Sequence, residues 1–205
     1  MNNRSIAITV NTLMQLSASA DGLPVACVIR GVLAQTKGDE ASRFLKSVKH
    51  ASGQNYIVGV GDRVYDFEAS ANKVVEFRPT PDDSFVYHTN HPLANDDLKP
   101  WYAKAMQAMT SEEKKKDNSI VRLDSLRTHL NRPVAAVDEQ IAKETLQSRD
   151  SKENPICRHL APGNHGFTFG STVMSLSDKP FFQVTMGPPD SNRYLRLEFT
   201  RAGRN

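Results

Sequence analysis

The sequence predicts an α+β protein in which antiparallel sheets are covered by helices. Segments with an apolar residue at every second position alternate along the chain with segments in which apolar residues recur every three or four positions. Short turns divide the segments of period two, so their strands are expected to pair as hairpins. Because strands and helices come in separate blocks, the arrangement is α+β. The 205 residues have room for one domain, 1–205, with a sizeable core.

The first half is expected to hold one strand, two helices and a block of four strands. Residues 4–10 alternate polar and apolar positions, and they read as a strand. Apolar residues at helical spacing predict two consecutive amphipathic helices over 24–36 and 40–50. The period then changes to two, which predicts strands over 55–60, 64–68, 73–77 and 84–88.

The second half is expected to be helical first and then to return to strands. The region 95–155 is polar and helical, with Ser119 as the cap of a helix that ends before Pro133 and a further helix starting near Val137. Alternation then predicts strands over 167–176, 181–186 and 194–199. The tail 201–205 is expected to be loose.

Composition excludes several classes of protein. Hydrophobic residues make up 39% and charged residues 24%, as in ordinary soluble proteins, which argues against disorder, collagen and a membrane bundle. A net charge of +3 gives no reason to expect a nucleic-acid partner. No stretch has the ~18–20 apolar residues of a membrane span, and the start is no secretory signal, so no membrane contact and a cytoplasmic location are expected. Two cysteines are too few for a disulfide scaffold.

The densest polar cluster is His88-Thr89-Asn90-His91, at the end of the expected strand 84–88. Only two histidines lie close together there, and no cysteine or glutamate has ligand spacing, so no metal is expected. Thr89 and Asn90 could simply satisfy a turn between strand and loop. Alternatively, the side-chain amide of Asn90 donates a hydrogen bond to an oxyanion that develops during a reaction.

The two cysteines offer a weaker candidate site. Cys27 lies within an expected helix, off its apolar stripe, where a cysteine is usually a small packing residue. In Cys157-Arg158-His159, the arginine could lower the pKa of the thiol and a histidine could act as base. Neighbouring side chains of an extended chain point in opposite directions, however, so a structural or substrate-facing Arg158 is favoured.

Several motifs carry a resemblance to a known family. They are Asn3-x-x-Ile6-Ala7-Ile8-x-x-Asn11, Gly22-Leu23-Pro24-Val25, Asn55-Tyr56, Tyr65-x-Phe67-Glu68, Val86-x-His88-Thr89-Asn90-His91-x-Leu93, Ile156-Cys157-Arg158-His159 and Gly187-Pro188-Pro189. With them the chain resembles the acyl-coenzyme A:aminopenicillanic acid (isopenicillin-N) acyltransferase family of autoproteolytic N-terminal-nucleophile hydrolases, over about 2–93 and 155–199. The stretch His88 to Leu93 is the most specific part of the resemblance.

The resemblance implies a fold and a chemistry. The fold would be a four-layer αββα sandwich, and the reaction would be amide cleavage or acyl transfer on a small acyl or amide substrate, with no cofactor. In that family a precursor cuts itself to expose an amino-terminal cysteine, whose thiol attacks the acyl carbonyl with its own α-amine as base. Asn90 would be the catalytic oxyanion donor. The substrate-binding positions would be His88, Thr89, His91, Arg158 and His159.

Departures from the family pattern leave the activity open. The family's nucleophile and a supporting acidic residue lie upstream of the strand 4–10, and neither Cys27 nor Cys157 takes the nucleophile's place. His165 stands where the family has an arginine, and Ser5 stands where a glycine is usual.

Three hypotheses follow from these departures. The chain is an enzyme whose nucleophile comes from an upstream polypeptide or was lost through a misplaced start. Alternatively, it is an inactive, truncated family member or binding remnant. A third possibility is a thiol enzyme that uses Cys157 with His159 or His165. A fold incomplete at its amino terminus would also leave an uncovered sheet edge.

Overall fold

The computed structural model describes residues 1–78, 85–131, 137–162 and 166–200, and within them the chain is an α+β molecule. Six helices and two antiparallel sheets make up this part of the chain. The first sheet has the order β1-β2-β3-β4 and the second the order β5-β6-β7. Within each sheet, strands that follow one another in the sequence pair side by side, and the helices form separate blocks along the chain. The predicted α+β class is therefore confirmed.

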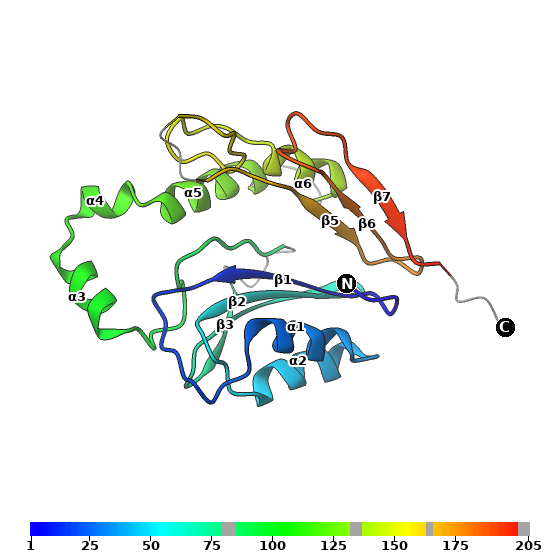
Figure 1. Cartoon of the computed structure of the whole chain (residues 1–205), viewed down its shortest axis with the longest axis horizontal. Coiled ribbons are helices and arrows are strands. Elements are labelled where there is room, and N and C mark those ends of the chain that lie inside the picture. Colours follow the sequence, from blue (N-terminus) through cyan, green and yellow to red (C-terminus); the bar gives the residue numbers. More distant parts are fainter. Residues whose placement is uncertain (79–84, 132–136, 163–165, 201–205) are drawn as a thin grey trace.

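The first sheet packs one face against two helices. Its strands are β1 (Ile6–Thr12), β2 (Gln54–Val60), β3 (Arg63–Ala69) and β4 (Val74–Phe77). Helices α1 (Val25–Leu33) and α2 (Gly38–Ser47) cover its lower face in Figure 1. The core between them is apolar and contains Ile6, Ile8, Val28, Val32, Ala41, Leu45, Tyr56, Val58, Phe67 and Ala69.

The opposite face of the same sheet is polar at one end. Because side chains alternate along a strand, Asn55 points away from the core that holds Tyr56 and Val58. Asn55 pairs with Asn11 of β1 on one side and with Glu68 of β3 on the other, so the three share this face. Asn55 and Glu68 have no exposed surface, and Asp66 of β3 is only 1% exposed. Polar groups buried in this way need partners, and the partners are described below.

A helical segment connects the two sheets. It consists of α3 (Pro100–Ala108), α4 (Ser111–Lys115), α5 (Asn118–Leu130) and α6 (Glu139–Leu146). The N-cap of α5 is Asp117, whose carboxylate accepts from the backbone N–H groups of Ser119 and Ile120. The prediction that Ser119 caps this helix is therefore wrong, because Ser119 lies in the first turn of α5. The expected end of this helix near Pro133 lies outside the described residues, and α5 ends at Leu130.

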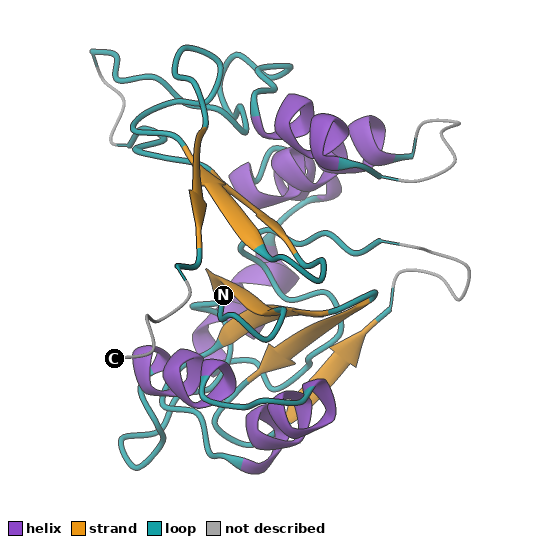
Figure 2. Cartoon of the chain, turned by 90° about the vertical axis from the view of Figure 1, so that its right-hand side faces the viewer, coloured by secondary structure: helices purple, strands orange, loops and turns teal. Residues whose placement is uncertain are grey.

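The second sheet lies on the side of the first sheet away from α1 and α2. Its strands β5 (Thr172–Ser175), β6 (Phe181–Val184) and β7 (Leu195–Glu198) are shorter than the sequence indicated. Figure 2 shows this sheet with α5 and α6 in the upper half of the molecule and the first sheet with its helices in the lower half. The sheets meet where the hydroxyl of Ser5 donates to the carbonyl of Ser177, 2.7 Å away. The arrangement is consistent with the αββα layering that the resemblance implies.

One predicted strand is wrong, and two predictions lie outside the described residues. Residues 85–88 form no strand, because their backbone crosses the polar face of the first sheet instead of pairing beside β4. Residue 84 and the tail 201–205 are outside the described residues. Among the described residues, β1 and β4 are the outer strands of the first sheet. In the described part of the chain, no helix is long and apolar enough to cross a membrane.

Candidate functional site

Residues 88–91 form a polar segment over the polar end of the first sheet. The chain here runs above the sheet, on the side opposite α1 and α2 (Figure 1). Its backbone is held by side chains: the amide of Asn11 donates to the carbonyl of His88 at 3.4 Å, and that of Gln15 donates to the carbonyl of Asn90 at 3.0 Å. The four residues therefore belong to one site with β1 and β3.

A buried ion pair anchors this segment. The Nε2 atom of His88 lies 2.8 Å from a carboxylate oxygen of Glu68, and Nδ1 lies 2.7 Å from the carbonyl oxygen of Thr89. Both ring nitrogens thus face acceptors, so both carry a proton and His88 is an imidazolium. Burial opposes this charge, but the hydrogen bond to Glu68 and the nearby Asp66 outweigh burial and raise the pKa of His88.

Glu68 also fixes the turn that follows the motif. Its two carboxylate oxygens accept from the backbone N–H groups of Leu93 at 2.5 Å, Ala94 at 3.0 Å and Asn95 at 2.6 Å. Burial alone would raise the pKa of Glu68, but His88 and these three N–H groups outweigh it and hold the pKa below its usual value. Glu68 is therefore an ionised carboxylate that orders the chain on both sides of residues 90–92.

A second buried carboxyl lies beside the pair. Asn11 donates to Asn55 at 3.1 Å, and the amide of Asn55 in turn donates to Oδ1 of Asp66. The Oδ2 atom of Asp66 has no hydrogen-bond partner among the described residues. Burial raises the pKa of Asp66 to about 7, although the charge of His88 and the bond from Asn55 oppose the rise. Near neutral pH this carboxyl exists in both protonation states.

The side-chain amide of Asn90 has a defined orientation. Arg122 of α5 donates from Nη2 to Oδ1 of Asn90 at 2.9 Å, so the NH₂ group of the amide points the other way. That group makes one long hydrogen bond, 3.4 Å to the carbonyl of Thr12. The backbone N–H of Asn90 donates to the hydroxyl of Ser119 at 2.6 Å. The amide is thus held by its oxygen and its backbone, and its N–H groups are left for weak contacts.

Thr89 and His91 attach the segment to the start of α5. Thr89 is 2% exposed, and its hydroxyl donates to the carbonyl of Ser119 at 2.9 Å. The Nδ1 atom of His91 lies 2.8 Å from the hydroxyl of Ser119. Burial, together with the positive charge of His88, lowers the pKa of His91. His91 is therefore a neutral side chain that positions the loop against the helix.

Arg158 joins this site, whereas His159 lies elsewhere. The Nη2 atom of Arg158 donates to Oδ1 of Asn118 at 2.7 Å, and the same oxygen accepts from Nε of Arg122 at 3.0 Å. Burial and the charge of Arg158 lower the pKa of Arg122, although both arginines remain cations. His159 bonds instead to Asp190, with Nε2 2.7 Å from Oδ1. The predicted substrate contacts of these residues stay predictions.

An apolar cavity of about 460 Å³ opens beside this site. Its polar end contains Asn11, His88 and Arg122, and the rest is lined mainly by aliphatic and aromatic side chains of α5, α6 and the segment 85–87. Among these are Phe85, Tyr87, Leu126, Leu130, Leu146 and Ile156. A cavity of this size and character, with polar groups at one end, is typical of a small-molecule site.

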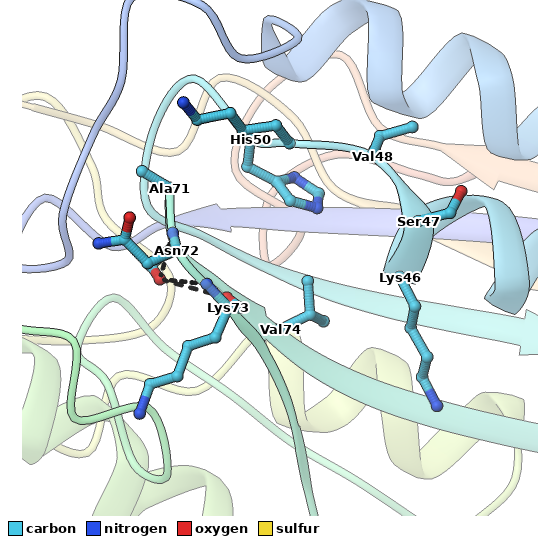
Figure 3. Close-up of a pocket in the computed structure, with 10 residues that line it drawn as sticks. Lys46, Ser47, Val48, His50, Ala71, Asn72, Lys73 and Val74 are labelled. Carbon is cyan, nitrogen blue, oxygen red and sulfur yellow. Dashed lines mark hydrogen bonds between the residues drawn. The ribbon is translucent and has the colours of Figure 1, made fainter.

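A smaller cavity, of about 280 Å³, offers no comparable chemistry. It lies between the end of α2 and the turn from β3 to β4, and Figure 3 shows the side chains of Lys46 and Lys73 pointing away from His50. Lys46 pairs with Glu76, and Lys73 pairs with Asp96. The ring of His50 donates from Nε2 to the carbonyl of Leu45 at 3.0 Å. Lys46, Lys73 and His50 therefore already have partners within the protein.

Neither cysteine takes part in the network around Asn90. Cys27 is exposed on α1, which covers the other face of the first sheet. Cys157 is buried near Asp190, and burial raises the pKa of its thiol. The network instead depends on residues for which the sequence gave no functional signal of their own: Arg122, Ser119 and Asp66. Only the alternation in Asp66-Phe67-Glu68, with acids at positions that a sheet buries, could have drawn attention to β3.

Comparison with known proteins gives one positive result. The sequence model of the family described as "Acyl-coenzyme A:6-aminopenicillanic acid acyl-transferase" matches residues 1–179. That range contains β1 to β5, all six helices and residues 88–91. None of the curated proteins compared with the sequence matches it.

Proposed function

The chain belongs to the acyl-coenzyme A:6-aminopenicillanic acid acyltransferase family, and from this premise we propose that it forms the oxyanion and acyl-binding part of a cysteine-dependent acyltransferase or amidohydrolase. The observation that carries the proposal is the amide of Asn90. Arg122 both lines the apolar cavity and holds the oxygen of that amide, which directs its N–H groups away from the arginine. An amide fixed in this way needs no reorganisation to stabilise an oxyanion.

The reaction would proceed through an acyl-enzyme. A terminal cysteine on an upstream polypeptide attacks the carbonyl carbon of the substrate, and its α-amine accepts the thiol proton. The carbonyl oxygen becomes negative and accepts a hydrogen bond from Nδ2 of Asn90. When the tetrahedral centre collapses, the carbon–nitrogen or carbon–sulfur bond breaks and the leaving group takes up the proton. Water or an amine then releases the acyl group from sulfur.

The cavity would hold the acyl group. Its walls are apolar, and its volume suits an aliphatic chain or an aromatic ring. His88 and Thr89 line it at the end nearest Asn90, which supports their assignment to substrate contact. Arg158 and Arg122 share the oxygen of Asn118, so their two positive charges lie close together and favour an anionic group on the substrate.

The first test is the composition of the protein in its native cell. We would measure the intact mass and the amino-terminal residue of the chain and of any peptide that co-purifies with it. A co-purifying peptide, or an upstream extension, that begins with cysteine is the expected result. A chain that starts at Met1 and lacks any such peptide would overturn the proposal.

The second test removes the oxyanion donor. In the enzyme assembled with its cysteine-bearing peptide, Asn90→Ala should lower turnover of acyl-p-nitroanilides by about 100- to 1000-fold, because one donor to the oxyanion is lost. Asn131→Ala, which changes an exposed asparagine at the end of α5, should leave turnover unchanged. Equal turnover of the Asn90 variant and the parent protein would remove Asn90 from the mechanism.

A matched pair of arginines tests the orientation of the amide. Arg122→Gln should lower kcat by about 10- to 100-fold with a smaller effect on KM, because a misdirected amide costs rate more than binding. Arg127 lies on the same helix, where it bonds to Asp124 and, at 3.4 Å, to the hydroxyl of Tyr87 in the cavity wall but not to Asn90, and Arg127→Gln should retain kcat. If both variants lose activity equally, the effect belongs to the helix and not to the orientation of Asn90.

A second candidate function follows from the positions of the cysteines. Because Cys27 is on the far side of the first sheet and Cys157 is buried beside Asp190, the chain on its own could bind an acyl compound without turning it over. In that case the separate chain would bind acyl p-nitroanilides stoichiometrically, and no acyl-enzyme would form when cysteine-bearing peptide is supplied.

A further inference from the structure

Three side chains with metal-binding atoms meet at a place apart from Asn90. The donor atoms of Cys157, His159 and Asp190 all lie within 4.8 Å of one another. Nε2 of His159 is 2.7 Å from Oδ1 and 2.9 Å from Oδ2 of Asp190, and the sulfur of Cys157 lies within 4.8 Å of both groups. The three donor groups thus converge on one another.

The surrounding structure holds these donors in place. The backbone N–H of Cys157 donates to the carbonyl of Ser148 at 2.9 Å, and Arg158 exchanges two hydrogen bonds with Thr168. On the other side, Gln147, the C-cap of α6, donates to the carbonyl of Pro189 at 3.0 Å, next to Asp190. Both chain segments are therefore fixed to their neighbours before any ligand binds, which lowers the cost of assembling a site.

The donor set is the one that zinc prefers. Thiolate, imidazole and carboxylate are the three common protein ligands of Zn²⁺, and three such ligands leave the fourth tetrahedral position for water. Donor atoms around one tetrahedral zinc lie about 3–4 Å apart, given bond lengths of about 2.0–2.3 Å. Side-chain shifts of about 1 Å would therefore bring the three donors to a common ion.

We propose that Cys157, His159 and Asp190 form a zinc site that ties the segment 157–159 to the loop 187–190. The thiol proton passes to solvent when the sulfur binds the ion, and the neutral imidazole, with its one hydrogen on Nδ1, binds through the lone pair of Nε2. Thiolate and carboxylate together balance the two positive charges of the ion. Arg149, with Nη1 3.7 Å from Oδ2 of Asp190, then pairs with the carboxylate from outside.

Exposure gives an ion a path to this site. Cys157 is fully buried, whereas the side chains of His159 and Asp190 are 34% and 22% exposed. The ion would therefore enter from the surface, with the sulfur beneath it and water on its outer side. The site has no shared residue with the network around Asn90, so its existence does not depend on the acyl-transfer proposal.

Cobalt substitution tests the site directly. The complete chain, reduced and freed of metal with a chelator, is titrated with Co²⁺, and the thiolate-to-cobalt charge-transfer absorption is recorded; Zn²⁺ is then added as competitor. We expect one Co²⁺ per chain, displaced by Zn²⁺. Zinc should also raise the unfolding temperature, since a ligand that binds only the folded state stabilises it.

The chain supplies its own control, because it has two cysteines. Cys157→Ala should abolish the absorption, whereas Cys27→Ala should leave it intact. Asp190→Asn and His159→Gln change partly exposed residues and should fold normally, and each should weaken metal binding by at least about 100-fold. The proposal is wrong if no absorption develops, if the absorption survives Cys157→Ala, or if Asp190→Asn binds Co²⁺ as tightly as the parent chain.

Discussion

At the scale of single residues, Ser5 shows a conflict between side chain and backbone. Its φ angle is +55°, in the left-handed region that glycine adopts without cost. In return, its hydroxyl makes the bond to Ser177 that joins the two sheets. Ser5 is thus a strained residue with one compensating hydrogen bond.

Two variants separate the backbone effect from the hydroxyl. Ser5→Gly and Ser5→Ala both lose the bond to Ser177, but only alanine keeps a Cβ at positive φ. We expect the glycine variant to be more stable than the alanine variant by about 1 kcal/mol in urea unfolding. Equal free energies of unfolding would show that the backbone at Ser5 is unstrained.

The sequence predicts only some of the residues that form the site. The cluster His88 to His91 attracts attention because polar residues are dense there, and Asn90 does bond to Arg122, which lines the apolar cavity. Arg122 and Ser119 looked like ordinary helix residues. Their contacts join positions about 30 residues apart, and no local pattern encodes such contacts.

At the scale of elements, helix α5 begins at the loop that carries Asn90. Its N-cap Asp117 accepts from Ser119 and Ile120, while the hydroxyl of Ser119 accepts from the backbone of Asn90. The cap therefore fixes the position of Ser119 and, through it, the position of Asn90.

Two equivalent caps test this coupling. Asp117→Ala and Asp138→Ala, at the N-caps of α5 and α6, should each lower the free energy of unfolding by about 1 kcal/mol, because each removes a capping acceptor. Only Asp117→Ala should shift the imidazole NMR signals of His88 and His91. Unchanged signals in that variant, or equal shifts in both, would contradict a specific link from the α5 cap to the loop.

Element prediction succeeded where local periodicity decides the structure. Helices α1 and α2 and strands β1 to β4 lie where their apolar periodicity indicated, within a few residues. The expected strand 84–88 was wrong, because Glu68 and Asn11 hold this part of the chain over the sheet by side-chain contacts to His88. The apolar residues Phe85, Val86 and Tyr87 all line the cavity instead.

At the scale of the whole molecule, a layer of buried polar groups lies on the inner face of the first sheet. Asp66 has a folded pKa of about 7, raised by burial above its ordinary value near 3.8. Between these two values the folded chain binds more protons than the unfolded chain. The contribution of Asp66 to stability is therefore fully present below about pH 4 and is lost as the pH rises to about 7.

Asp66→Asn should remove this dependence. The variant should gain stability relative to the parent as pH rises from 4 to 7, by at most about 4 kcal/mol, since one pKa unit corresponds to about 1.4 kcal/mol. Urea unfolding at pH 4, 5.5 and 7 measures the gain. Asp96→Asn is the control, because a hydrogen bond from Lys73 lowers the pKa of that exposed carboxyl and the effect has the opposite sign. Parallel profiles of the Asp66 variant and the parent would contradict a raised pKa.

By itself the sequence determined the α+β class, the helices and strands of the first half and the family, because each depends on local periodicity or on short motifs. The tertiary structure alone decided which residues surround Asn90, the protonated state of His88 and the meeting of Asp190 with Cys157 and His159. These features join side chains that are distant along the chain. Their energies arise from burial and from hydrogen bonds that exist only once the sheets and helices have packed.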